Sequence, residues 1–275
     1  MIRTLTVLGG DRRQAHLVRL LRDRGYPVSC HSVPGLPDTH ETLVGSIRSA
    51  GALLLPMPAL DEGLIRGSRL EAADVLRAAN PGTVILGGKL GGLPKRGDLI
   101  FRDYAEDESL AILNAVPTAE AAIALALEHM PRTLWGSQVL VIGWGRIGSA
   151  LAQRLCLLGS HVTVASRSPA HRAACRTLDL RDDETGRYSH PLSEYDCIFN
   201  TVPCPILSPD QLAAVRPGCP LLDLASLPGG LSPDCVRPEN YIPALALPGK
   251  YFPVTAAEIL CDVIIRQLSE LEETL

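Results

Sequence analysis

The fold of this chain is decided by the stretch Gln138-Val139-Leu140-Val141-Ile142-Gly143-Trp144-Gly145-Arg146-Ile147-Gly148. Its first five residues read as a buried strand, because Val139 to Ile142 form an apolar run, and its last six match the pattern G-x-G-x-x-G. Helical spacing then continues to Leu158, Gly159 ends it, and a second apolar strand begins at Val162. This order of strand, glycine turn, helix and strand is the fingerprint of a dinucleotide-binding α/β domain.

Each of the three glycines of the motif is required for a different physical reason. The first makes the tight turn, the second lets backbone amides reach a pyrophosphate, and the third lets the helix pack closely on the strand. The N-terminus of the following helix faces the anion. We therefore expect all six motif residues to line a cofactor site: Gly143, Trp144, Gly145, Arg146, Ile147 and Gly148.

Short apolar runs alternate with helical patterns along the rest of the chain, which predicts an α/β fold with parallel sheets. The expected domains are an N-terminal open parallel α/β sheet, residues 1–114 with 251–275, and an NAD(P)-binding Rossmann domain, residues 115–250. A helix from Pro117 to Leu127 bridges them. The apolar face of a helix over 255–271 is expected to cross back to the first domain. Strands are predicted at 5–8, 28–32, 52–56, 83–87, 138–142, 162–165, 196–201, 221–225 and 241–246.

Composition excludes several classes of protein. Hydrophobic residues make up 46% of the 275 residues and charged residues 20%, which is typical of folded globular domains. A formal net charge of -4 argues against a nucleic-acid partner. The eight cysteines contain no C-x-x-C pair and the seven histidines show no metal spacing, so we expect reduced thiols and no metal. No targeting segment and no run of roughly 18 apolar residues is visible, which predicts a cytoplasmic protein with no membrane partner.

The end of the strand after the fingerprint distinguishes the two nicotinamide cofactors. An acidic residue there accepts the ribose hydroxyls of NAD and repels the 2′-phosphate of NADP. This strand instead ends Val164-Ala165-Ser166-Arg167-Ser168. The Arg167 guanidinium can fork onto a phosphate, and the hydroxyls of Ser166 and Ser168 can donate to it. The sequence therefore favours NADP, and the alternative is that Arg167 is a solvated surface charge and NAD also binds.

Two later loops are expected to flank the ribose and nicotinamide, because ligands of open α/β sheets bind at the carboxyl ends of the strands. Asn200-Thr201-Val202-Pro203 closes one strand, and Asp223-Leu224-Ala225-Ser226-Leu227-Pro228-Gly229-Gly230 closes the next. Thr201, Val202, Pro203 and Ala225 are the predicted cofactor contacts. The alternative is that these prolines and glycines serve only the turns.

A further set of segments is spread over the chain: Gly9-Gly10-Asp11-Arg12-Arg13-Gln14, Asn114-Ala115-Val116-Pro117-Thr118-Ala119-Glu120, the glycine fingerprint, Asn200 to Pro203, Leu222 to Ser226 with Pro228 to Gly230, and Ala246-Leu247-Pro248-Gly249-Lys250. Together these segments resemble the A subunits of dipicolinate synthases. Only the first and last are distinctive alone, because the other loops also resemble those of alanine and D-2-hydroxyacid dehydrogenases. Beyond Gly249 the chain departs from the family pattern, which ends Ala-Pro-Lys-Thr-Ala-Gly, and reads Tyr251-Phe252-Pro253-Val254-Thr255-Ala256-Ala257.

The resemblance implies an NADP-dependent oxidoreductase that converts a dihydrodipicolinate to pyridine-2,6-dicarboxylate (dipicolinate) during sporulation. It implies a location in the mother-cell cytoplasm and a partner, the flavoprotein-like B subunit of dipicolinate synthase. The oligomeric state stays open, a homo-oligomer included.

The two carboxylates of such a substrate would be bound by cations, and its oxidation would need a proton acceptor. Arg13 and Lys250 are the predicted contacts for the two carboxylates, each also open to interpretation as a surface charge. Glu120 is the candidate base, and Ser226 lies in the loop expected beside the nicotinamide. Glu120 could equally serve as a carboxylate favoured by a helix dipole. Together with Asn114 and Thr118, these two residues are expected near the cleft between the domains.

Two other functions remain open at this point. The first is an NAD(P)-dependent amino-acid or 2-hydroxyacid dehydrogenase, supported by the Asp223 to Gly230 loop. Such enzymes usually present a histidine or arginine near the nicotinamide, where this loop has Ser226. The second is a non-catalytic NADP-binding subunit of a complex, in which a partner carries out the chemistry.

Overall fold

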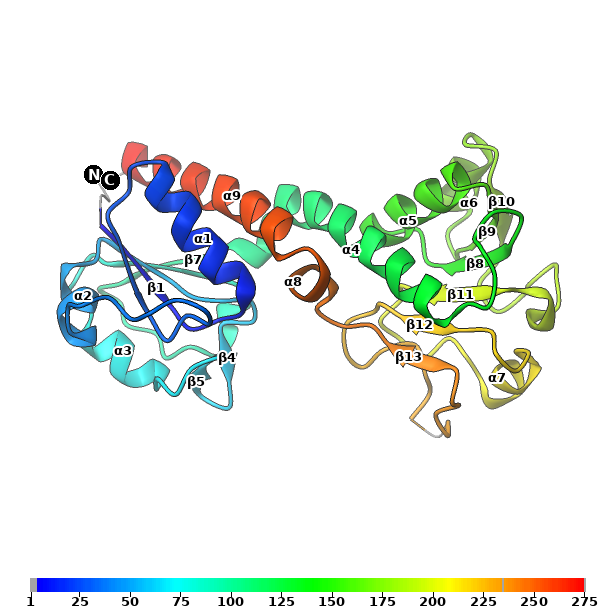
Figure 1. Ribbon diagram of the computed structural model, residues 1–275, viewed down its shortest axis with the longest axis horizontal. Coiled ribbons are helices and arrows are strands. Elements are labelled where there is room, and N and C mark those ends of the chain that lie inside the picture. The colour runs from blue at the N-terminus through cyan, green and yellow to red at the C-terminus, as the bar shows by residue number, and fades with distance from the viewer. Residues whose placement is uncertain (1–3, 234, 275) are drawn as a thin grey trace. The chain divides into compact units, whose positions relative to one another are not determined.

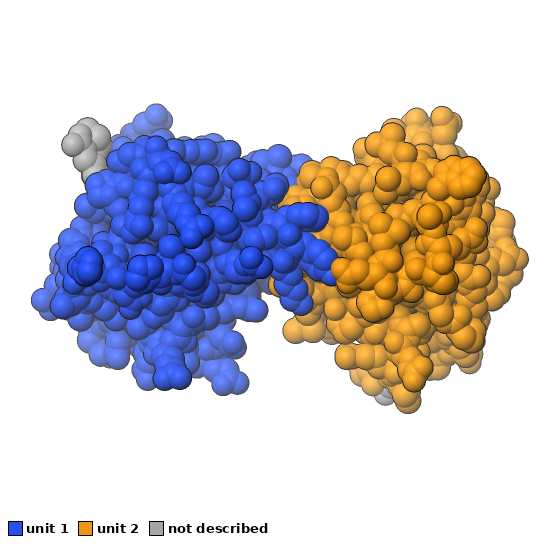
Figure 2. All heavy atoms as spheres, viewed as in Figure 1, with its two compact units in different colours: residues 1–114, 248–275 blue, residues 115–247 orange. Residues whose placement is uncertain are grey.

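The computed structural model describes residues 4–233 and 235–274, and the chain divides into two compact units (Figure 2). Unit 1 comprises residues 1–114 and 248–275, and unit 2 comprises residues 115–247. Unit 1 is discontinuous because the C-terminal helix α9 (Pro253–Thr274) packs on α1 (Arg12–Asp23). The predicted α/β fold, with two domains and a helix that returns to the first, is confirmed.

The sheet of unit 1 is parallel and has the strand order β2-β1-β3-β6-β7. The helices α1 and α9 lie side by side on one face of it (Figure 1). Helices cover both faces, and alternate residues of each strand point to opposite sides. Leu5 and Val7 pack against α1 and α9, whereas Leu8 packs on the opposite face, against α2 (Leu43–Ser49) and α3 (Ala72–Ala78). The strands are β1 (Leu5–Leu8), β2 (Val28–His31), β3 (Ala52–Leu54), β6 (Val84–Gly87) and β7 (Ile100–Asp103), and the other helices are α2 (Leu43–Ser49) and α3 (Ala72–Ala78).

A small hairpin, β4 (Leu60–Asp61) and β5 (Leu64–Ile65), follows β3. The backbone after it lies against the turn after β1, because the Gly10 amide donates to the carbonyl of Arg66 at 2.7 Å. A Cβ on Gly67 would collide with the carbonyl of Gly10. The hairpin is therefore fixed above the carboxyl end of β1. Two 3-10 turns, Leu90–Gly92 after β6 and Tyr104–Glu106 after β7, follow the carboxyl ends of their strands.

Unit 2 is a Rossmann domain with a parallel sheet in the order β10-β9-β8-β11-β12-β13. Leu140 and Ile142 point into a core with Ile198 and Leu221, on the side of α7. The opposite face packs against α5. The strands are β8 (Gln138–Ile142), β9 (His161–Ala165), β10 (Arg181–Asp183), β11 (Cys197–Asn200), β12 (Leu221–Asp223) and β13 (Tyr241–Pro243), and the helices are α5 (Arg146–Leu157), α6 (Pro169–Arg176) and α7 (Pro209–Ala214), with a 3-10 turn at Leu192–Glu194.

The bridging helix α4 (Glu108–His129) differs from its prediction, which started it at Pro117. Pro117 lies inside the helix, and the first turn is instead near Asp107. The helix is long and apolar enough to cross a membrane by length and composition alone, a test that buried helices of soluble proteins also pass. Its alanines Ala119, Ala121 and Ala122 are fully buried within unit 2.

The loop that leads into α4 is tied to α9 by one carboxylate. Asp107 accepts hydrogen bonds from Arg266 at 2.6 Å and Gln267 at 3.0 Å, and from Ser109 at 2.6 Å and the Leu110 amide at 3.1 Å. Burial alone would raise the pKa of Asp107, but these hydrogen bonds outweigh it and hold the pKa well below its ordinary value.

A carboxyl group with a depressed folded pKa stabilises the fold above its unfolded pKa, and this contribution is lost as the pH falls toward the folded value. We expect Asp107→Asn to be less stable than the parent at pH 7, and the difference to shrink below about pH 4. Urea unfolding midpoints of both proteins at pH 7 and pH 3 test this. A difference of equal size at both pH values would contradict the assignment.

Candidate functional site

The glycine turn between β8 and α5 has a backbone that fits a dinucleotide. Gly143 has a φ of 106°, and a Cβ there would collide with the hydroxyl of Thr201. A Cβ on Gly148 would collide with the carbonyl of Gly143, so the third glycine keeps helix and turn in contact. A Cβ on Gly145 would meet no heavy atom within 4 Å. The second glycine is thus not required by the fold, and its open side is where a pyrophosphate can approach the backbone.

The N-terminus of α5 adds to this fit. Gly145 is the cap residue, so no side chain caps the 12-residue helix. Its positive dipole end therefore lies at the exposed turn. Arg146 is exposed there, and Trp144 and Ile147 are partly exposed.

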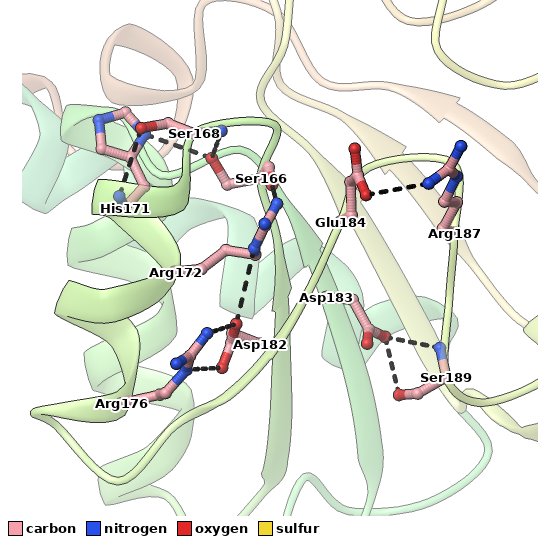
Figure 3. A network of polar contacts seen from close by, with 10 residues as sticks. All are labelled: Ser166, Ser168, His171, Arg172, Arg176, Asp182, Asp183, Glu184, Arg187 and Ser189. Atoms are coloured by element: carbon pink, nitrogen blue, oxygen red, sulfur yellow. Dashed lines mark hydrogen bonds and ion pairs between the residues drawn. The ribbon is translucent and has the colours of Figure 1, made fainter.

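Polar side chains cluster where β9 ends (Figure 3). Ser166 is buried, and its hydroxyl lies 3.3 Å from His171 Nδ1 and accepts from the Ser168 amide at 3.3 Å. Ser168 caps α6, and Arg172 donates to the Ser166 carbonyl at 3.0 Å. Arg167 is exposed between the two serines. Serine hydroxyls, imidazole and guanidinium groups in one place are suited to a phosphate.

The carboxylates beside this cluster already have partners. Asp182 accepts from Arg176 at 2.7 and 3.1 Å and lies 3.8 Å from Arg172, and the hydrogen bond from Arg176 lowers its pKa. Asp183 accepts from the amide and hydroxyl of Ser189, both at 3.0 Å (Figure 3). Two guanidinium groups therefore offset the charge of Asp182, and the carboxylate of Asp183 is bonded to the loop that follows β10.

The turn after β11 is fixed from two sides. Thr201 donates from both its amide and its hydroxyl to the carbonyl of Ile142, each at 2.9 Å, which joins it to the end of β8. Asn200 is fully buried and exchanges hydrogen bonds with the backbone of Val202. Thr201 and Val202 thus lie beside the glycine turn, with Pro203 following. In the loop after β12, Ala225 is buried and Ser226 is exposed.

A second polar site lies in unit 1, at the carboxyl end of β1. The Arg13 side chain is 12% exposed and donates to both carboxylate oxygens of Asp11, from Nε at 2.9 Å and from Nη2 at 2.7 Å. Nη2 also reaches the carbonyl of Met57 at 3.4 Å. Burial raises the pKa of Asp11, but Arg13 and Arg66 lower it by more. The guanidinium therefore sits between the ends of β1 and β3.

That position is the topological switch point of the sheet, because β2 lies on one side of β1 and β3 on the other. Open α/β sheets bind ligands in the crevice at such a point. Asp11 and Met57 engage only Nε and Nη2 of Arg13, so a ligand carboxylate could be held by Nη1. Tyr104 lies in the same place, buried, and donates to the carbonyl of Leu55 at 2.7 Å.

The segment that carries Lys250 packs over Arg13. It forms α8 (Leu247–Tyr251), and a Cβ on Gly249 would lie 3.0 Å from Asp11 and 3.1 Å from Arg13 Nε. Lys250 itself is exposed. The structure therefore brings Gly249 of the last resemblance segment close to Asp11 and Arg13 of the first, with Lys250 as the next residue.

Glu120 lies in the middle of α4, where its carboxylate accepts from Arg154 of α5 at 3.2 Å. It is about half exposed. This ion pair gives Glu120 a partner within unit 2. Asn114 and Thr118 lie on the same helix.

Comparison with known proteins identifies the family. Residues 119–222 match the NAD binding domain of D-isomer specific 2-hydroxyacid dehydrogenases. The A subunit of dipicolinate synthase from Bacillus subtilis (strain 168) is 30% identical over 287 residues, which cover 98% of this chain and 96% of the relative. This chain belongs to the family of dipicolinate synthase A subunits.

Solved structures support the assignment. The dipicolinate synthase A subunit from Bacillus halodurans superposes with a TM-score of 0.85 at 25% identity, over 97% of each chain. An L-alanine dehydrogenase shares the fold alone, with a TM-score of 0.64 at 11% identity over 97% of this chain and 90% of its own. The resemblance inferred from short segments is thus confirmed, and the NAD binding domain indicates an oxidoreductase with a nicotinamide dinucleotide cofactor.

Two polar side chains of this family member were not predicted from the sequence. His171 and Arg172 reach Ser166 from the first turns of α6. Pro169 after Ser168 signals a helix start, and the spacing from there could have placed both residues back at the strand end.

Proposed function

We propose that this chain is the A subunit of a dipicolinate synthase that uses NADP⁺ to oxidise dihydrodipicolinate to dipicolinate. The observation that carries the cofactor assignment is the cluster at the end of β9. Ser166, Arg167 and Ser168 stand where an NAD-specific domain has an acidic residue, and Arg172 and His171 join them.

The reaction removes one hydride and one proton from the dihydropyridine ring and yields an aromatic ring. NADP⁺ supplies the hydride acceptor when bound. Gly143, Gly145, Gly148 and the start of α5 would hold its pyrophosphate, while Thr201, Val202, Pro203 and Ala225 would border its nicotinamide half.

The chain's own residues would orient the substrate and take the proton. Arg13 and Lys250 are proposed to hold the two carboxylates, each contact contributing about 1.5 to 3 kcal/mol. Arg13 is suited because it is buried at the switch point and its Nη1 is not used by Asp11 or Met57. Glu120 and Ser226 are the candidates for the proton. Arg154 donates to the Glu120 carboxylate at 3.2 Å, and this hydrogen bond would hold the carboxylate in one orientation.

The relatives are A subunits of a synthase, and this name supports a partner chain. We propose that the partner is a flavoprotein-like B subunit and that both act in the cytoplasm of a sporulating cell. The direct experiment incubates the purified chain with NADP⁺ and dihydrodipicolinate, with and without that partner, and measures dipicolinate. Cofactor binding without turnover in both mixtures would leave a non-catalytic binding role and overturn the enzyme assignment.

Arg167→Glu is expected to weaken NADPH binding by about 10 to 100-fold, because one charge-assisted contact is replaced by repulsion. NADH affinity should be unchanged, since NADH lacks the 2′-phosphate. Arg181→Glu is the control: it makes the same charge change at the start of β10, where Arg181 contacts Gln138 at 3.2 Å. Fluorescence titration of both cofactors measures the effect. Equal loss of NADPH affinity in the two variants would contradict the site.

A further inference from the structure

We propose that Asp223 is a positioning residue that fixes the two loops bordering the nicotinamide half of the cofactor. The inference rests on the proposed function and assigns a role to a carboxylate that the reaction itself does not use. Asp223 is the last residue of β12 and is 3% exposed.

Four donors from separate segments converge on this one carboxylate. Oδ1 accepts from Asn200 Nδ2 at 2.8 Å and from the Ala225 amide at 3.1 Å. Oδ2 accepts from the Gly230 amide at 2.8 Å and from the hydroxyl of Tyr241. A carboxylate has about four lone-pair sites, so this one is fully used, and a neutral side chain could not accept from all four donors. Because Asn200 also holds Val202, the network reaches both loops.

The Pro-Gly-Gly turn closes directly over this carboxylate. A Cβ on Gly229, whose φ is 88°, would lie 2.8 Å from Asp223 Oδ2. A Cβ on Gly230 would collide with the amide of Asn200. Only glycine at both positions therefore lets the turn reach the carboxylate.

The location points to the nicotinamide half of the cofactor. The sheet order β10-β9-β8-β11-β12-β13 places the glycine turn at β8, the cluster around Ser166 at β9, and Asp223 on the other side, at β12. In this fold the dinucleotide spans the crevice where the strand order reverses. With the 2′-phosphate side at β9, the loops at β11 and β12 face the nicotinamide side. Burial and the bond to Asp223 also raise the pKa of Tyr241, which stays a donor.

The test separates the two halves of the cofactor. In Asp223→Asn the new amide group faces two donors, whichever way it turns, so at least two hydrogen bonds are lost. NADPH affinity should fall by about 30-fold, while the affinity for adenosine 2′,5′-bisphosphate, which lacks the nicotinamide half, should stay within about 2-fold. Tyr241→Phe removes only one donor and should lower NADPH affinity by about 5-fold. This milder variant keeps the test decisive if Asp223→Asn does not fold.

Asp196→Asn is the matched control. Asp196 is also a buried carboxylate, 4% exposed, but it lies at the amino end of the strands of the same sheet, where it accepts from the Gln138 amide at 2.7 Å. Its variant should lose stability and keep both affinities. Equal losses for NADPH and the bisphosphate, or no loss for either in Asp223→Asn and Tyr241→Phe, would overturn the positioning role. Failure of the parent chain to bind the bisphosphate would instead overturn the proposed function.

Discussion

Gly145→Ala is expected to fold like the parent chain and to bind NADPH at least about 100-fold more weakly. The added Cβ meets no heavy atom within 4 Å, and Gly145 has an ordinary φ of -90°, so the fold has room for it. The same Cβ occupies the side from which the pyrophosphate would approach. Loss of two charge-assisted contacts to the backbone accounts for the expected effect. The free energy of unfolding should fall by about 1 kcal/mol or less, because alanine is a poorer N-cap than glycine.

Gly148→Ala is the matched comparison, because the same atom is added three residues later. Its Cβ would collide with the carbonyl of Gly143, a backbone atom that cannot move aside. We expect overpacking to lower the free energy of unfolding by about 3 kcal/mol. Replacing glycine inside a helix should offset about 1 kcal/mol of this loss. Urea unfolding and NADPH titration of both variants give the test. Similar unfolding midpoints with similar NADPH affinities would show that the two glycines have no separate roles.

Arg13→Ala is expected to lower kcat/KM for dihydrodipicolinate by about 100-fold while NADPH affinity stays unchanged. The reason is the loss of a charge-assisted contact to one substrate carboxylate, at a residue in unit 1 rather than in the Rossmann domain. Dipicolinate formation in the presence of the B subunit measures the effect. An unchanged kcat/KM would remove Arg13 from the substrate site.

The control for Arg13 separates substrate contact from its structural pairing with Asp11. Asp11 caps α1 by accepting from the Arg13 amide at 2.9 Å, and serine is also a good cap. Asp11→Ser therefore keeps the cap and releases the Arg13 side chain. Its kcat/KM should stay within about 5-fold of the parent, because the guanidinium remains. If Asp11→Ser loses as much activity as Arg13→Ala, the ion pair and not the guanidinium is what matters.

The sequence alone predicted the sheets' central strands and the glycine turn, because both depend on local patterns. Val139 to Ile142 is buried and lies in a strand paired on both edges, and central strands of parallel sheets, covered on both faces, are continuous apolar runs. Of the four edge strands of the two parallel sheets, β2 and β13 were predicted, whereas β7 and β10 were missed because they lack such an apolar run. Each pairs with one neighbour only, so Phe101-Arg102-Asp103 and Arg181-Asp182-Asp183 carry charges that hide the strand pattern. The start of α4 was also missed, since Pro117 is usually a first-turn residue.

By itself, the sequence determined the α/β class, the returning C-terminal helix, the family and the dinucleotide fingerprint. Each of these depends on residues that are close together in the chain or that recur in a periodic pattern. Only the tertiary structure decided what surrounds each polar group: that Arg13 is paired with Asp11 and meets the segment of Gly249, that Arg172 turns back to Ser166, and that Asp223 gathers four donors. These contacts join residues from separate strands and helices. Periodicity cannot reveal them, because the direction and partner of a buried polar side chain are set by how the elements pack.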